Sequence, residues 1–169
     1  MSTHAPPGQA PGRVQAAQRE AELLLAMLAW ATALIHVLAA AHHYREWVLY
    51  GVFFTILAPA QAIWGVLVVR RPGDRRLLAA GGAVNLAVAC VWAISRTTGI
   101  PVGPTPWRPE AIGWHDIVAT LNELAIAAIV AGMLGMLPLS EEQLARAARY
   151  IAVPLLVITV LAASLAHQH

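Results

Sequence analysis

Histidines and carboxylates near the apolar segments are the residues that could carry out chemistry in this chain. Six of the seven histidines and three acidic residues belong to this group: His36, His42, His43, His115, His167, His169, Glu46, Asp116 and Glu123. Neutral imidazole together with carboxylate oxygens suits zinc, copper or non-haem iron. An ionisable side chain inside a membrane-spanning helix is costly to insert and is a functional candidate for that reason. These residue types therefore predict a transition-metal site.

The spacing of four of these residues places them on two helical faces. His36 and His43 are seven residues apart, so they lie on one face of a helix, two turns apart. Asp116 and Glu123 have the same spacing on a later segment. If the two faces meet with opposite directions, His36 lies level with Glu123, and His43 lies level with Asp116. The two levels are about 10 Å apart at the rise of an α-helix, so the pattern predicts two stacked sites, or one site with a relay.

The predicted metal site has five main ligands and five accessory residues. The main ligands are His36, His43, Glu46, Asp116 and Glu123, and the accessory residues are His42, His115, Arg96, His167 and His169. A protein with such a site would sense, buffer or hand over a transition-metal ion (copper, zinc or iron). The residues indicate neither which metal it would be nor any substrate.

Other interpretations of the same residues stay open. A structural network needs no metal, because His36 can pair with Glu123 and Arg96 can neutralise a carboxylate. A haem or quinone contact is a further alternative, and His36 is the only well-buried candidate for an axial haem ligand. A membrane metalloenzyme would use Glu46 as general base beside a metal-bound water, although no H-E-x-x-H cluster is present.

Five apolar segments must position these residues. They span about residues 23–43, 47–69, 77–95, 114–137 and 150–166, and each has roughly the 17–25 residues that cross a bilayer. Charged residues make up 12% of the chain, about half the share in soluble domains. The chain is therefore predicted to be an all-α, polytopic membrane helix bundle in contact with the lipid bilayer. No basic stripe with interleaved aromatic residues points to nucleic acid.

The ends of the segments predict the remaining organisation. Residues 1–18, rich in Pro, Gly, Gln and Ala, are predicted to form a disordered cytoplasmic tail, and residues 19–169 the five-helix domain. Ala39–Ala41 resembles a signal-peptidase site, but its apolar run is longer than a signal segment, which favours a retained span. Ser140 and Gln143 form a capping box, so the fifth helix should begin near Glu141.

Arginine distribution predicts the orientation. With five spans, the side that holds the N-terminus carries eight arginines and the other side carries three: Arg45, Arg96 and Arg108. Because positive residues accumulate on the cytoplasmic side, the N-terminus is predicted inside and the C-terminus outside. The protein would lie in the bacterial inner (plasma) membrane, with the His/carboxylate site on the extracytoplasmic side. The small-residue motifs Gly81-Gly82 and Ala128-x-x-x-Gly132 allow close helix packing, in a homo-oligomer or in a larger membrane complex.

Two stretches of the chain carry a resemblance. One is S-R-T-T-G-I-P-V-G-P (residues 95–104) with E-A-I-G-W-H-D (110–116), and the other is H-x6-H-x2-E leading into G-V-F-F (36–54). Over roughly residues 30–135 the chain resembles small multi-span membrane proteins of actinobacteria and related bacteria. The resemblance implies a multi-span fold and assigns no activity. It points to His36, His43, Glu46, Arg96, Asp116 and Glu123. Four prolines and three glycines in residues 95–114 predict a cap without regular helix at one end of the bundle.

Overall fold

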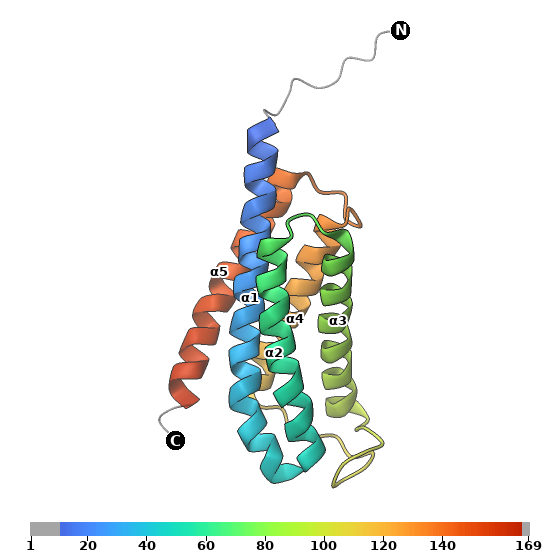
Figure 1. Cartoon of the computed structure of the whole chain (residues 1–169). Coiled ribbons are helices and arrows are strands. Elements are labelled where there is room, and N and C mark those ends of the chain that lie inside the picture. Colours follow the sequence, from blue (N-terminus) through green and yellow to red (C-terminus); the bar gives the residue numbers. More distant parts are fainter. Residues whose placement is uncertain (1–10, 167–169) are drawn as a thin grey trace.

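The protein is a bundle of five α-helices. A computed structural model describes residues 11–166, and within this range there are helices and no strands. The helices are α1 (Pro11–Glu46), α2 (Val48–Arg70), α3 (Arg75–Thr97), α4 (Trp114–Met133) and α5 (Glu141–Ala166) (Figure 1). All five are long and apolar enough to cross a membrane. The prediction of an all-α bundle with five membrane-spanning helices is confirmed.

The first helix begins earlier than the apolar pattern indicated. Helix α1 starts at Pro11, so the prediction of a disordered tail is wrong for residues 11–18, while residues 1–10 lie outside the described range. Proline is favoured at the first helical position, and the Ala, Gln and Arg residues that follow favour helix. Glu20 further attaches this part of α1 to α5, because its carboxylate accepts hydrogen bonds of 2.6 and 2.8 Å from the guanidinium of Arg149.

Local capping explains the ends of α4 and α5. Gly135 has a φ of 75°, and Met136 N donates a hydrogen bond to Ala131 O, which closes α4 in a Schellman motif. The helix therefore ends at Met133, and the predicted span to residue 137 was too long. Helix α5 begins at Glu141, as the capping box predicted: Ser140 and Gln143 exchange hydrogen bonds of 2.9 and 3.2 Å.

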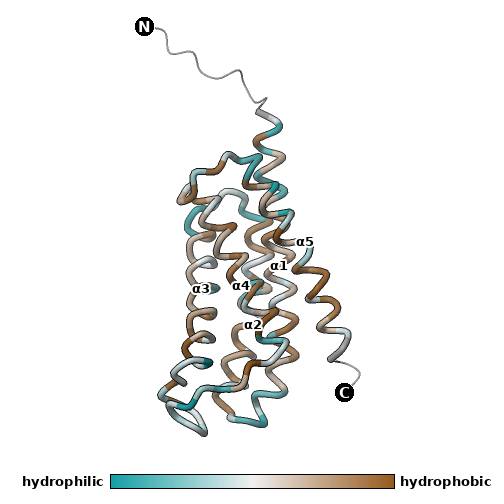
Figure 2. Tube along the Cα trace, turned by 180° about the vertical axis from the view of Figure 1, so that it is seen from behind, coloured by the Kyte–Doolittle hydropathy of each residue, from teal (hydrophilic) through white to brown (hydrophobic). Residues whose placement is uncertain are grey.

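Helix α1 is the centre of the bundle and has α2, α4 and α5 as neighbours. Its residues Leu25 and Leu28 are fully buried and form one core with Ile126 of α4. Figure 2 shows hydrophilic positions gathered mostly at the two ends of the bundle, with hydrophobic positions along the helices between them. The expected lipid-facing surface therefore runs around the middle of the molecule.

Helices α2 and α3 make few contacts with each other, although a short turn joins them. Helix α3 packs against α4 and hardly touches α2, although only residues 71–74 separate the two helices (Figure 1). Near the turn the indole of Trp64 lies between them: its Nε1 donates to Leu77 O at 2.9 Å, and its ring covers Gly81. The small-residue motifs thus serve contacts inside the chain, since Gly132 is likewise covered by Leu144.

A buried carboxylate ties this turn to α1. Glu22 is 1% exposed, and it accepts hydrogen bonds from Gly73 N at 2.7 Å and from Arg19 at 3.2 Å. This role was not predictable from the sequence, because Glu22 comes directly before the apolar run and resembles an ordinary flanking charge. The contact fixes the position of the α2–α3 turn against α1.

Candidate functional site

The predicted site residues gather at one end of the bundle, which we call the histidine end. It is formed by the end of α1, the start of α2, the end of α3 and the start of α4, and it holds two cavities with shared walls. The vestibule has a volume of about 810 Å³ and the inner cavity about 100 Å³. One or both are lined by every predicted site residue in the described range, namely His36, His42, His43, Glu46, Arg96, His115, Asp116 and Glu123. His167 and His169 lie outside that range.

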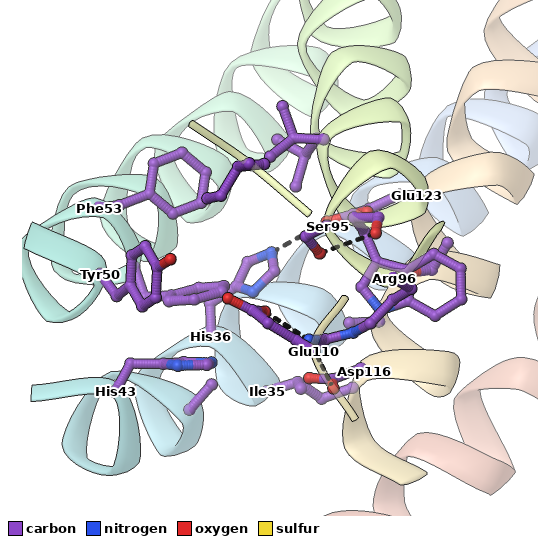
Figure 3. Close-up of a pocket in the computed structure, with 18 residues that line it drawn as sticks. Ile35, His36, His43, Tyr50, Phe53, Ser95, Arg96, Glu110, Asp116 and Glu123 are labelled. Carbon is purple, nitrogen blue, oxygen red and sulfur yellow. Dashed lines mark hydrogen bonds and ion pairs between the residues drawn. The ribbon is translucent and has the colours of Figure 1, made fainter. Parts of the chain in front are cut away.

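The deeper of the two predicted levels is formed. His36 Nε2 lies 3.2 Å from Glu123 Oε1, and each side chain is only 2% exposed (Figure 3). The two atoms are within ion-pair distance, but their alignment is not that of a hydrogen bond, so the contact is mainly electrostatic. The condition on which the predicted levels depend is met, because α1 and α4 are neighbours.

The upper level differs from the expectation. His43 and Asp116 line the same cavity, but each has another partner. His43 Nδ1 lies 2.6 Å from Glu46 on its own helix, and its ring stacks on Phe54 with 4.5 Å between ring centroids. Asp116 Oδ2 accepts from a guanidinium nitrogen of Arg96 at 2.7 Å, a partner whose charge is permanent. The expected pairing of His43 with Asp116 between α1 and α4 is therefore not formed, and the carboxylate partner of His43 is Glu46.

Arg96 is the electrostatic centre of the histidine end. Its side chain is 9% exposed and forms ion pairs with Glu110 and Asp116 (Figure 3). Glu110 belongs to the segment between α3 and α4, and its N–H also donates to Ser95 O at 3.0 Å. This segment contains no helix, as its prolines and glycines predicted, and Tyr50 holds it from the other side by donating to Val102 O. The ion pairs thus fasten the cap to α3 and α4.

Glu110 and Tyr50 were missed by reasoning from sequence alone. Neither follows a helical spacing with the histidines, because Glu110 lies in an irregular segment and Tyr50 in the first turn of α2. One signal was available for Glu110. Arg96 sits at the end of an apolar helix and needs counter-charges, and Glu110 is the only acidic residue in the segment that follows it.

Two hydrogen-bond donors on the wall of the inner cavity have no acceptor. Trp92 Nε1 and Arg96 Nε are buried and make no hydrogen bond within the described residues. Most of the remaining wall is apolar or aromatic and includes Ile35, Tyr50, Phe53, Phe54, Val88 and Val91. An unsatisfied buried donor costs about 1–3 kcal/mol. A group that accepts hydrogen bonds from these two donors would remove this cost.

Metal ligands are less completely assembled. The described part of the chain contains no group of three or more His, Cys, Asp and Glu side chains that could hold a metal ion. His36 and Glu123 supply two adjacent donor atoms, while His43 is drawn toward Glu46. Glu46 also lies 3.2 Å from His42, so two imidazoles share one carboxylate at the edge of the vestibule.

Comparison of the chain with family models, with curated proteins and with solved structures finds no match. What the site does must be derived from its own residues.

Proposed function

We propose that this integral membrane protein binds a small neutral molecule from the bilayer in its inner cavity, and that a quinone ring is the class that fits best. The observation that carries the proposal is the pair of unpartnered donors, Trp92 Nε1 and Arg96 Nε, on one largely apolar wall. A carbonyl oxygen that accepts from them removes their desolvation cost. A contact with a quinone was one of the alternatives that the sequence left open.

The charges around the cavity favour a neutral ligand. The guanidinium of Arg96 already faces two carboxylates, Glu110 and Asp116, which offset its charge. Glu123 lies at the same cavity, so a further anion would meet like charges there. A carbonyl oxygen accepts hydrogen bonds without carrying a net charge, so it suits the two unpartnered N–H groups.

Shape and lining favour a flat ring. The inner cavity of about 100 Å³ is continuous in its walls with the vestibule, and Phe53, Phe54 and Tyr50 supply aromatic faces and edges. An apolar cavity of roughly 150 Å³ accommodates benzene, so a quinone ring would fill the inner cavity and extend into the adjoining vestibule. Aromatic pairs contribute about 0.5–1.5 kcal/mol beyond the area that they bury.

The expected orientation places the site on the outer side of the cytoplasmic membrane. The arginine imbalance supports this direction. The histidine end contains the end of α1, so it lies opposite the end of the bundle where α1 begins. A ring in the inner cavity would then lie near the outer leaflet, with the vestibule between it and the aqueous phase.

Substituting Trp92 tests the donor pair. Trp92→Phe keeps an aromatic ring and removes the N–H, so the affinity for 2,3-dimethoxy-5-methyl-1,4-benzoquinone should fall about tenfold, the equivalent of one hydrogen bond. Titration calorimetry on protein in quinone-free nanodiscs measures this affinity. Trp114→Phe is the matched control, because Trp114 is 54% exposed and lines neither cavity. A wild type that does not bind the quinone, or an equal loss in both variants, would refute the proposal.

Metal binding is a second candidate, supported by the buried contact between His36 Nε2 and Glu123 Oε1. Imidazole and carboxylate are suitable ligands for zinc, copper or iron, and waters would have to complete the coordination. Elemental analysis of protein purified without a histidine tag should find near-stoichiometric metal in the wild type, and loss of it in His36→Gln and Glu123→Gln. Metal-free wild type, with both variants less stable, would make the pair a structural contact only.

A further inference from the structure

A third cavity continues from the inner cavity along α2 and α3. This α2–α3 groove has a volume of about 150 Å³ and is lined by Leu57, Ala60, Gln61, Trp64, Ala80, Gly81, Val84, Asn85, Val88 and Glu123. Val88 and Glu123 also line the inner cavity, so the two cavities are neighbours with these side chains as a shared wall. An interhelical hydrogen bond joins the same two helices, with Gln61 Nε2 donating to Asn85 Oδ1 at 2.7 Å.

The groove faces the lipid side of the bundle. Val84 in the groove and Phe53 and Val91 at the inner cavity are 51%, 42% and 47% exposed. These positions lie in the apolar middle and outer parts of α2 and α3, where the surroundings of a membrane protein are lipid chains. The opening exists because the two helices make few contacts with each other.

The groove is long enough for an extended apolar tail and is longer than a single quinone ring. From Trp92, at the inner cavity, to Gly81, at the far end of the groove, α3 advances eleven residues, or about 16 Å. Small side chains leave this path open on both sides, with Ala60 on α2 and Ala80 on α3. A molecule with its ring at Trp92 could therefore extend along the helices toward the middle of the membrane.

We infer that the ligand carries a long apolar tail and that the tail lies in the α2–α3 groove. This inference rests on the proposed function, since the ring in the inner cavity fixes where the tail begins. It narrows the ligand class to membrane quinones with a prenyl or alkyl chain, which are delivered sideways from the bilayer. The hydrophobic effect does not drive the tail from lipid into the groove, so its binding depends on close packing and on free space there.

Blocking the groove separates tail binding from ring binding. Val84→Trp fills the groove, while Leu86→Trp places the same side chain at a position on α3 that is equally exposed, 49% against 51%, and lies outside the groove. The two probes are 2,3-dimethoxy-5-methyl-1,4-benzoquinone and its 6-decyl derivative, titrated into nanodiscs of one lipid composition. Partitioning into lipid is then the same for all variants and cancels from each comparison.

The expected result is a loss of affinity for one of the two quinones in one of the two variants. Val84→Trp should weaken the decyl quinone about tenfold, a cost typical of overpacking, and leave the tailless quinone unchanged. Leu86→Trp should change neither affinity. Ala60→Phe, which enters the groove from α2, repeats the test if Val84→Trp does not fold.

Four results would overturn the inference. Unchanged binding of the decyl quinone to Val84→Trp, or an equal loss in Leu86→Trp, would place the tail elsewhere and leave the ring site standing. Equal weakening of both quinones by Val84→Trp would show a general distortion of the site. If neither quinone binds the wild type, the proposed function fails, and this inference fails with it.

Discussion

Replacing Arg96 with leucine should lower the melting temperature of the detergent-solubilised protein by roughly 6–12 °C, which corresponds to about 3 kcal/mol for a chain of this size. The substitution leaves the carboxylates of Glu110 and Asp116 without their shared cation, and these groups are only 30% and 22% exposed. Removing one partner of a buried ion pair costs more than the pair contributes, because a charge stays behind. Thermal unfolding followed by circular dichroism measures the change.

Two further variants show whether charge is the cause. Arg108→Leu removes an exposed arginine from the segment between α3 and α4. It should change the melting temperature by no more than about 2 °C. The triple variant Arg96→Leu, Glu110→Gln, Asp116→Asn removes all three charges and should recover much of the loss. If Arg96→Leu melts like the wild type, the cluster does not fasten the cap. A triple variant that is no more stable than the single one would assign the loss to packing.

Adding one methyl group at Gly81 should destabilise the bundle by about 2–3 kcal/mol. A Cβ at this position would lie 1.9 Å from the indole of Trp64, a distance that no side chain tolerates. The ring of Trp64 must then move, which breaks its hydrogen bond to Leu77 O and disturbs the packing near the α2–α3 turn. The melting temperature of Gly81→Ala, compared with the wild type in the same detergent, measures this effect.

The matched control for Gly81→Ala is Gly12→Ala, because a Cβ at Gly12 meets nothing within 4 Å. It should be neutral or slightly stabilising, since alanine favours helix over glycine by about 1 kcal/mol. Replacing Trp64 with leucine in the Gly81→Ala background makes room and should recover part of the stability. Equal melting of Gly81→Ala and wild type would mean that the bundle is loosely packed here.

The helices themselves were predictable because membrane thickness imposes a length on each apolar run. The packing of α1 against α4 was also predictable in part. His36 and His43 are seven residues apart, as are Asp116 and Glu123, and this spacing indicated two helical faces that could meet. The contact of His36 with Glu123 agrees with this pattern. Arg96 had been considered as a residue that could neutralise a carboxylate, but spacing along one helix cannot reveal a partner from an irregular segment, and for that reason Glu110 was not expected beside it.

Features that depend on three-dimensional distance were not accessible from the sequence. The start of α1 at Pro11 is supported by the Glu20–Arg149 ion pair, whose members are 129 residues apart. The unpartnered donors Trp92 Nε1 and Arg96 Nε become meaningful only when their surroundings are known. The α2–α3 groove, too, depends on how few contacts are made by two helices that a short turn would ordinarily bring together.

The position of Trp64 has a consequence for how the groove would be filled. Its indole already holds α2 and α3 apart beside Gly81, so an incoming molecule does not have to separate them. Such a molecule only exchanges places with the hydrocarbon chains of neighbouring lipids. The bilayer then acts as the reservoir, and occupancy of the protein would follow the mole fraction of the molecule among the lipids. A cell could therefore set the state of this protein by changing the composition of its membrane, with no change in the surrounding water.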